Sequence, residues 1–252
     1  NDNEYELHLC RTLSRRISVW CFTNHVQPQN SITSKVSAMP QSSPGIIGVI
    51  GVGLLGSALC HRLRRAGYHV IGYDTQAKQL EYLLHIGGRA AGSVEEIAKS
   101  STTILLSLPD SGISKTVCTN LMAYTSRNST IIDTTTGAPE DAISNSALLE
   151  TKGIQFLDAT VAGSSSQVHD GEGVMMVGGN KEVFNQCSQI LDDLCDRTFY
   201  VGPTGSGARV KLIVNLAIGL NRAVLAETLA LADASSINLQ TALEVLKATP
   251  AY

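Results

Sequence analysis

The sequence carries little net charge and has no long uncharged apolar run. Its 19 Lys and Arg residues are nearly balanced by 22 Asp and Glu residues, for a formal net charge of -3. Such a balance gives no reason to expect nucleic acid or an anionic membrane as a partner. No uncharged apolar stretch reaches the roughly 20 residues of a membrane-spanning helix. We therefore expect a soluble protein.

The sequence also lacks the cysteine spacing of a disulfide framework. None of its six cysteines forms a C-x-x-C pair, and no other paired spacing is present: Cys10, Cys21, Cys60, Cys118, Cys187 and Cys195. This pattern favours free thiols in a reducing compartment. No metal is predicted as a cofactor.

The first 44 residues are poor in acidic side chains. Between Glu6 and Asp74 the sequence contains no Asp or Glu, whereas Arg and Ser are frequent before residue 44. This composition is typical of an organellar transit peptide and predicts a mitochondrial or plastid protein. The chain begins with Asn1 and its first Met is Met39, so a cytoplasmic protein translated from Met39 is the alternative. In either case we expect residues 1–44 to be a disordered leader or a non-native extension.

From Gly45 onward, short apolar runs alternate with helix-like stretches. The runs predict strands at 46–50, 69–73, 102–106, 130–132, 154–157 and 174–177. The stretches between them predict helices to about Arg65 and at about 77–85, 94–99, 112–124, 139–150 and 181–194. Strands alternating with helices favour an α/β fold with a doubly wound, mostly parallel sheet of the Rossmann type. We expect a dinucleotide-binding domain over residues 45–204.

The pattern changes after Gly207. Apolar residues recur at helical spacing from there to about Ala234, with no Pro, which predicts one long helix. A second helix is expected from about Leu239 to Ala248. We interpret residues 205–252 as the start of an all-α domain for substrate binding or dimerisation that is cut short.

The glycine-rich turn after the first strand is the strongest local signal. Gly51, Gly53 and Gly56 form a G-x-G-x-x-G sequence, with Leu54 and Leu55 between the last two glycines. In this context the first glycine permits a tight turn and the second lets the backbone approach a pyrophosphate. The third allows the helix to pack closely on the strand. The pyrophosphate is then held by free N–H groups at the helix N-terminus.

Asp74 sets the expected cofactor. It lies eighteen residues beyond Gly56, at the end of the second strand. A carboxylate there accepts hydrogen bonds from the ribose hydroxyls and repels a 2′-phosphate. Thr75 and Gln76 follow, with no Arg to neutralise such a phosphate. The sequence therefore favours NAD over NADP.

Two further motifs follow in the second half of the chain. Residues 158–164 read D-A-T-V-A-G-S, with M-V-G-G at 176–179, and residues 205–215 read G-S-G-A-R-V-K-L-I-V-N. Together with the glycine turn, and in this order and spacing, they resemble the β-hydroxyacid dehydrogenase family, and within it the 3-hydroxyisobutyrate dehydrogenases. The resemblance covers residues 45 to about 252.

The resemblance implies several site residues. Leu108 and Pro109 match the turn after the third strand that lies against the cofactor. Thr136 matches a cofactor-contacting position in the family's D-x-S-T segment. Lys211 matches the catalytic lysine, and Asn215 matches the asparagine that helps hold the substrate and the lysine.

The chemistry of Lys211 also follows from the residue itself. Oxidising an alcohol by hydride loss requires the hydroxyl proton to leave as well. A lysine whose pKa is lowered toward neutrality by partial burial can accept that proton. Lys211 and Asn215 are four residues apart, so both project from the same face of the long helix.

The substrate-binding segment departs from the family pattern. Ala162 stands where the family has a serine that donates to the substrate carboxylate, and Ser164 replaces the second glycine. The N–H groups of Gly163 and Ser164, or the hydroxyls of residues 164–166, are candidate replacements. Ile113 replaces a further family asparagine. These departures affect the expected substrate more than the expected chemistry.

We interpret the chain as an oxidoreductase that transfers a hydride between a small 3-hydroxy acid, similar to 3-hydroxyisobutyrate, and NAD. Lys211 is the expected general acid/base, and a homo-oligomer is the expected assembly. One alternative is a glyoxylate or succinic semialdehyde reductase of the same superfamily, although those enzymes generally carry Asn-Arg where Asp74 and Thr75 stand. A second is 6-phosphogluconate dehydrogenase, which is nearly twice as long and has a basic cluster for its phosphorylated substrate. A third is a non-catalytic dinucleotide-binding scaffold, similar to a chromatin-associated relative that has lost its lysine, and the presence of Lys211 argues against it.

Overall fold

The computed structural model describes residues 45–249 as one mixed α/β unit built on a single sheet. The predictions for residues 1–44 lie outside the described residues. The strands are β1 (Ile46–Ile50), β2 (His69–Tyr73), β3 (Arg89–Ala90), β4 (Thr103–Leu106), β5 (Thr130–Asp133), β6 (Gln155–Ala162), β7 (Val174–Gly179) and β8 (Arg197–Gly202). Their order in the sheet is β3-β2-β1-β4-β5-β6-β7-β8. Neighbouring strands are parallel except β6 and β7, which confirms the predicted doubly wound, mostly parallel sheet.

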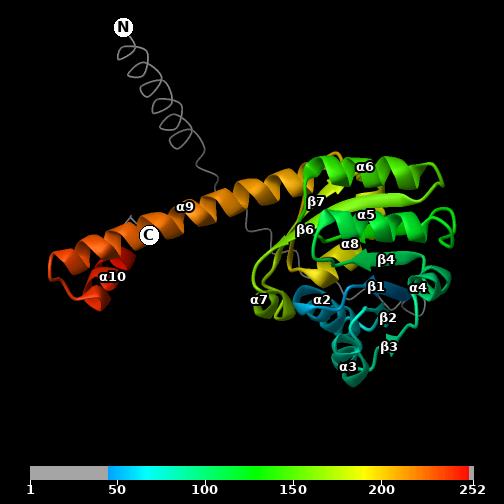
Figure 1. Ribbon diagram of the computed structural model, residues 1–252, viewed down its shortest axis with the longest axis horizontal. Coiled ribbons are helices and arrows are strands. Elements are labelled where there is room, and N and C mark those ends of the chain that lie inside the picture. Colours follow the sequence, from blue (N-terminus) through cyan, green and yellow to red (C-terminus); the bar gives the residue numbers. More distant parts are fainter. Residues whose placement is uncertain (1–44, 250–252) are drawn as a thin grey trace, which may run out of the picture. The chain divides into compact units, whose positions relative to one another are not determined.

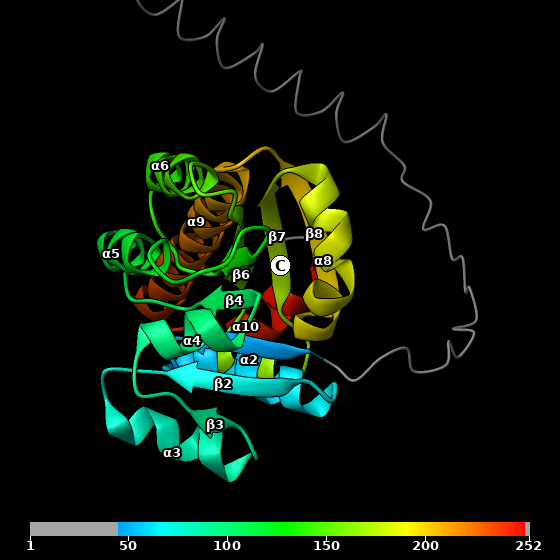
Figure 2. The same cartoon turned by 90° about the vertical axis from the view of Figure 1, so that its right-hand side faces the viewer.

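Helices cover both faces of the sheet (Figures 1 and 2). One face is covered by α2 (Leu54–Arg65), α3 (Ala77–His85), α7 (Ser165–His169) and α8 (Lys181–Leu194). The other face is covered by α4 (Val94–Ser100), α5 (Ser111–Leu121) and α6 (Pro139–Glu150). Because parallel strands need a crossover between them, the alternation of strand and helix along the chain leads to this layered arrangement.

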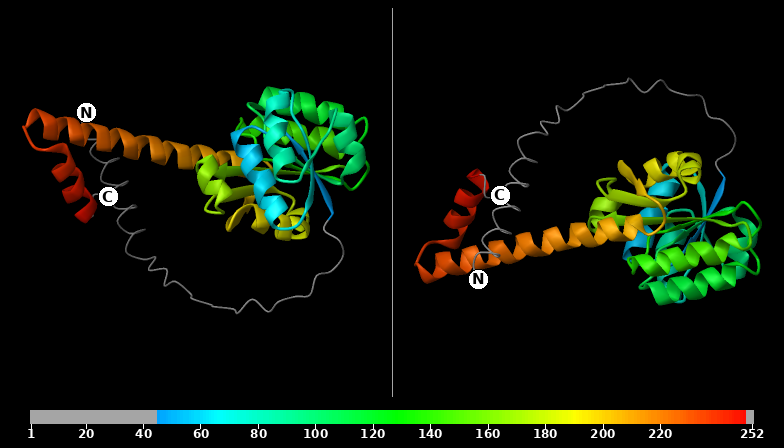
Figure 3. Two further views of the ribbon diagram at one scale, coloured as in Figure 1. Left: turned by 90° about the horizontal axis from the view of Figure 1, so that it is seen from below. Right: turned by 90° about the horizontal axis from the view of Figure 1, so that it is seen from above.

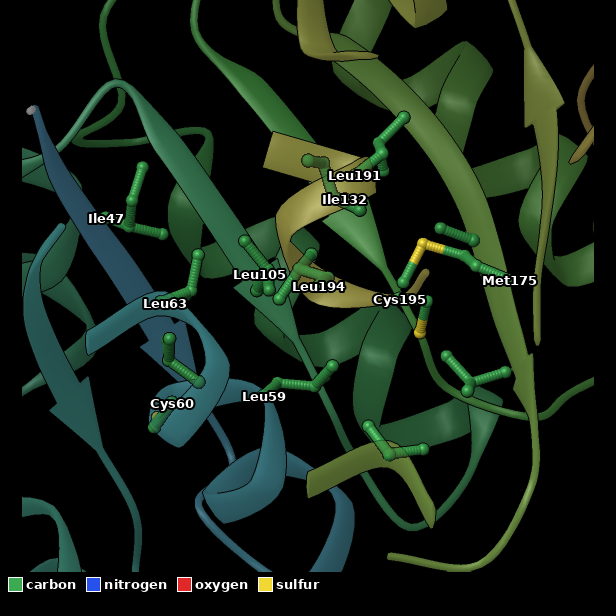
Figure 4. Close-up of a cluster of buried hydrophobic side chains, with 14 of the residues drawn as sticks. Ile47, Leu59, Cys60, Leu63, Leu105, Ile132, Met175, Leu191, Leu194 and Cys195 are labelled. Carbon is green, nitrogen blue, oxygen red and sulfur yellow. The ribbon is translucent and has the colours of Figure 1, made fainter. Parts of the chain in front are cut away.

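Side chains of the strands alternate between two apolar clusters, one on each face. Ile132 of β5 packs with α2 and α8, whereas its neighbour Ile131 packs with α4 and α5. Figure 4 shows the first cluster, to which α2 contributes Leu63 and α8 contributes Leu194. A strand that is buried on both faces is apolar along its whole length. This explains why the central strands could be recognised as continuous apolar runs.

The structure contains three elements that the sequence pattern does not predict, namely β3, α7 and β8. The first two have two and five residues, which is too short for a periodic pattern. Strand β8 lies at the sheet edge and begins three residues after α8 ends, with no Gly or Pro between them to indicate a turn. Strand β6 also runs five residues beyond its predicted end, to Ala162, and α5 ends at Leu121, three residues early.

The predicted long helix is α9 (Ser206–Ala234), and α10 (Leu239–Ala248) packs against its far end (Figure 3). The start of α9 is buried against β6, β7 and α6, whereas most apolar side chains from Leu212 onward are exposed. Among residues 45–249, α9 is the one helix that is long and apolar enough to cross a membrane by length and composition. A single helix of this kind is weak evidence for a membrane span, so the prediction of a protein without a membrane partner stays a prediction.

The four described cysteines are free and buried: Cys60, Cys118, Cys187 and Cys195. Burial raises the pKa of the Cys60 thiol to about 12 and that of Cys195 to about 11. Because the thiolate is the reactive form, these residues act as small apolar side chains of the core. Cys10 and Cys21 lie outside the described residues.

Candidate active site

The glycine turn between β1 and α2 has the geometry that its sequence predicts. Gly51 has a φ of 89°, and a Cβ on it would overlap the Ser107 carbonyl oxygen. A Cβ on Gly56 would overlap the carbonyl oxygen of Gly51, which shows how closely α2 packs on the turn. Gly53, the N-cap of α2, has no heavy atom within 4 Å of the place its Cβ would take. The open side of the turn is therefore at Gly53, where a ligand can approach the backbone.

Asp74 lies directly beside this turn. One carboxylate oxygen accepts a hydrogen bond from the Val52 N–H and the other from the Gln76 N–H, each at 2.8 Å. These bonds fix the carboxylate at the end of β2 and tie the glycine turn to it. Each oxygen keeps a further lone pair for a ligand hydroxyl, because a carboxylate oxygen accepts two hydrogen bonds.

A cavity of about 500 Å³ opens in front of the turn and Asp74. Its lining includes seven further residues that the sequence predicts for the cofactor: Gly51, Gly53, Leu54, Leu55, Leu108, Pro109 and Thr136. Gly56 does not line the cavity, in agreement with its packing role. Ile113, which replaces a family asparagine, also lines it and adds an apolar surface.

Two loops that are hydrogen-bonded to each other form a further wall of the cavity. The Leu108 N–H donates to the hydroxyl of Thr135 at 3.2 Å, and the Thr134 hydroxyl donates to the Leu106 carbonyl at 2.8 Å. The turn at Leu108 and the segment that carries Thr136 are thereby joined. The size of the cavity, the open approach at Gly53 and the placed carboxylate fit an extended dinucleotide.

Lys211 lies on the first turns of α9, next to the end of β6. Its ammonium group donates a hydrogen bond to the Val161 carbonyl at 2.7 Å. Partial burial lowers the pKa of the lysine from its ordinary value. The structure thus places the Lys211 amine against the strand end that leads into Ala162 and Gly163.

The remaining substrate residues are placed less favourably. Ala162 and Gly163 follow Val161 directly, but the Ser164 N–H donates to the side chain of Gln167 at 2.8 Å. The Ser164 hydroxyl accepts from the Gln167 N–H, which completes a capping box at the start of α7. The N–H of Ser164 is therefore engaged within α7, and the hydroxyl proton is the donor it has left. Asn215 is exposed on α9, one turn beyond Lys211.

Asp158 is a buried carboxylate that sequence reasoning does not assign to the site. It accepts the N–H groups of Gly205 and Ala208 at the start of α9, and burial raises its pKa. The nearby hydroxyl of Thr160 donates to the Gly207 carbonyl at 2.9 Å. A signal was present, because an acidic residue within an apolar strand needs partners for its charge.

The sheet order, the glycine turn and the acid at the end of β2 define a Rossmann-type dinucleotide-binding protein. Residues 46–202 match the family model described as the NAD binding domain of 6-phosphogluconate dehydrogenase. The chain therefore belongs to this family, the β-hydroxyacid dehydrogenases, and carries an NAD(P)-binding domain. This confirms the resemblance seen in the motifs.

Two relatives of known activity match over 203 residues, or 79% of this chain. The 2-(hydroxymethyl)glutarate dehydrogenase of Eubacterium barkeri is 29% identical, and 67% of its length is covered. Glyoxylate/succinic semialdehyde reductase 1 of Arabidopsis thaliana is 28% identical, with 70% covered. Among solved structures, 3-hydroxyisobutyrate dehydrogenase of Mycobacterium tuberculosis with L-serine has a TM-score of 0.78 at 22% identity. That match covers 83% of this chain and 72% of the other, and shows the shared fold.

Proposed function

We propose that the protein is an NAD-dependent dehydrogenase of a small 3-hydroxy acid similar to 3-hydroxyisobutyrate, with Lys211 as its general acid/base. The observation that carries this proposal is the position of the Lys211 amine, 2.7 Å from the Val161 carbonyl. That carbonyl directly precedes Ala162 and Gly163, which match the family's substrate segment. A half-buried lysine beside this segment is suited to proton transfer at a substrate hydroxyl.

The proton steps can be assigned to residues of this chain. In the oxidising direction the neutral Lys211 amine accepts the hydroxyl proton as the carbon–oxygen double bond forms. Bound NAD supplies the acceptor for the hydride that leaves the same carbon. In the reducing direction the Lys211 ammonium returns the proton to the carbonyl oxygen. The Gly163 N–H and the Ser164 hydroxyl are the proposed donors to the substrate carboxylate.

The preference for NAD rests on Asp74 and its neighbours. Its carboxylate is held in place by two backbone N–H groups, and Thr75 and Gln76 line the cavity beside it. A 2′-phosphate at this position would lie against a carboxylate, with no basic side chain among the residues that line the cavity. We expect NAD to bind at least about tenfold more tightly than NADP, which corresponds to about 1.4 kcal/mol.

A reductase of small aldehydes is the second candidate. The similarity to glyoxylate/succinic semialdehyde reductase 1 favours it, because the same lysine serves both directions of the reaction. The carboxylate at Asp74 argues against the NADPH that drives such reductions. The third candidate, a scaffold without catalysis, does not account for a lysine placed against the substrate segment.

We also propose that the chain assembles with itself through α9. Large apolar side chains are exposed along this helix, among them Ile213 (65%), Leu216 (64%) and Leu231 (69%). Apolar surface of this kind marks an interaction site more often than free surface. Sedimentation velocity should give a mass above that of one chain. Leu216→Glu should lower this mass, whereas Lys152→Glu, at an exposed residue just after α6, should leave it unchanged.

One spectrophotometric screen tests the enzymatic proposal. The protein is incubated at high pH with a series of 3-hydroxy acids and either NAD or NADP. In a second series it is incubated with small aldehydes and either NADH or NADPH, and the reduced nicotinamide is followed in both. We expect turnover with a branched three- or four-carbon 3-hydroxy acid and NAD. Turnover only with NADPH and an aldehyde would favour the reductase, and NAD binding without turnover of any acid or aldehyde would favour the scaffold.

A further inference from the structure

We propose that Asp158 is a positioning residue for Lys211: by fixing the first turn of α9 to β6, it sets where the lysine amine lies. The inference rests on the proposed function of Lys211. It concerns a residue outside the cofactor cavity, since Asp158 does not line that cavity and its hydrogen bonds go to Gly205 and Ala208 rather than to the lysine.

Both carboxylate oxygens of Asp158 accept hydrogen bonds from the start of α9. Its two oxygens accept the N–H groups of Gly205 at 2.9 Å and Ala208 at 3.0 Å. These N–H groups have no partner within the helix, and the positive end of the helix dipole favours an anion there. Asp158 is only 3% exposed, so the helix N-terminus takes the place of water around the charge.

The chain leaves no room between α9 and the sheet at this point. A Cβ on Gly178 of β7 would lie 2.9 Å from both the Gly207 nitrogen and the Pro203 carbonyl oxygen. A Cβ on Gly207 would be 2.7 Å from the Met176 carbonyl oxygen. The backbone of α9 therefore rests directly on the backbone of the strands, and the contact has little freedom to slide.

Three successive contacts join β6 to α9, and Lys211 makes the last of them. Asp158 holds the first turn, Thr160 donates to the Gly207 carbonyl at 2.9 Å, and Val161 accepts from Lys211 at 2.7 Å. The lysine is only three residues beyond Ala208, less than one helical turn. A shift of the first turn would therefore move the amine relative to the substrate segment that begins at Ala162.

A carboxylate is required at this position. Each oxygen of Asp158 accepts a backbone N–H group. No ion pair in residues 45–249 includes Asp158, so these N–H groups are what balances its charge. An amide has one oxygen and an NH₂ group, which would point a donor at a donor. Asp158→Asn therefore breaks the grip on α9 while conserving the volume of the side chain.

The test measures the titration of Lys211 directly. Lysines are dimethylated with ¹³C-formaldehyde, and the Lys211 signal is identified by its absence in Lys211→Met. In the wild-type protein we expect Lys211 to titrate below the other lysines. In Asp158→Asn its titration should move toward theirs, because a loosened α9 exposes the amine to water.

Asn180→Ala is the matched control. Asn180 also accepts two backbone N–H groups, from Glu182 and Val183, at the start of the long helix α8. Its loss should lower the melting temperature and leave the Lys211 titration unchanged. If Asp158→Asn shifts this titration no more than Asn180→Ala does, Asp158 is merely structural and the inference is wrong.

Thr160→Val covers the case in which Asp158→Asn does not fold. It removes the second contact with little change of shape, and it should shift the Lys211 titration in the same direction by a smaller amount. A folded Thr160→Val protein with wild-type titration would overturn the inference. With a hydroxy acid in hand, Asp158→Asn should lower kcat about tenfold or more at unchanged NAD affinity. If the Lys211 titration shifts in Asp158→Asn but the wild-type protein turns over no hydroxy acid, the proposed function is refuted and the positioning role of Asp158 is retained.

Discussion

The cofactor half and the catalytic half of the site are built differently. Around the glycine turn and Asp74, the geometry is fixed by contacts between residues close in sequence or on adjacent strands, and these residues line a cavity of about 500 Å³. Around Lys211, the geometry depends on residues about 50 positions away, and the donors expected for a substrate are engaged or exposed. Binding a dinucleotide therefore needs less of the chain than performing chemistry on a substrate.

The largest test of this difference removes the lysine amine. Lys211→Met keeps the apolar length of the side chain and should lower kcat by about 10²–10⁴-fold, the usual contribution of a general acid–base group. NAD affinity should remain within twofold, because the glycine turn and Asp74 do not contact Lys211. Steady-state kinetics and NAD titration decide the result. A kcat within a few-fold of wild type would mean that the proton is transferred elsewhere.

Two glycine substitutions separate ligand approach from packing in the cofactor half. Gly56→Ala places a Cβ against the Gly51 carbonyl, and overpacking of this kind costs about 1–3 kcal/mol. It should lower the melting temperature and weaken NAD binding by about 10- to 100-fold. Gly53→Ala places its Cβ in open space, so it should weaken NAD binding at an unchanged melting temperature. Equal effects of the two variants on stability would contradict the assigned roles.

The choice between the two cofactors should change by a smaller factor. Asp74→Ala removes the charge that opposes a 2′-phosphate, and the preference of about tenfold for NAD should fall toward equality. Fluorescence titration with both cofactors measures this ratio. Asp74 also holds the Val52 and Gln76 N–H groups, so some loss of NAD affinity is expected too. Equal affinities of the wild-type protein for both cofactors would remove the basis of the prediction.

The smallest expected effect on stability concerns two stacked histidines, one on α2 and one on α7. His61 of α2 and His169 of α7 stack with their ring centroids 3.8 Å apart, near Arg65 and Arg62 and with Asp170 and Tyr82 at the rim. Burial, followed by His169 and the two arginines, lowers the pKa of His61.

A lowered pKa means that the unfolded chain binds a proton more readily at His61 than the folded protein does. This contribution to stability is therefore present above the ordinary histidine pKa and is lost as the pH falls below it. We expect the melting temperature to decrease slightly between pH 7.5 and 5.5, and less so in His61→Gln. An identical decrease in both proteins would place the sensitive group elsewhere.

The sequence predicts the elements that carry the proposed cofactor half because its signals are local. The strand, the glycine turn and Asp74 are each recognisable within a few residues, and their order in the sheet follows from the Rossmann pattern. The engagement of Ser164 was also readable, since Ser164 and Gln167 have the spacing of a capping box. The hydrogen bonds from Gly205 and Ala208 to Asp158 could not be predicted in this way, because they join residues 47 and 50 positions apart. Only the fold brings those residues together.

A long helix that is anchored at one end moves most at its other end when it tilts. With 29 residues α9 is about 44 Å long, and its anchored end is the first turn, which lies against β6 and β7. A tilt of about 5° at this anchored end displaces the opposite end by about 4 Å but moves the backbone of Lys211 by only about 1 Å. The same anchored turn that keeps the lysine nearly stationary therefore also decides where the exposed apolar side chains of α9 are presented to whatever packs on them.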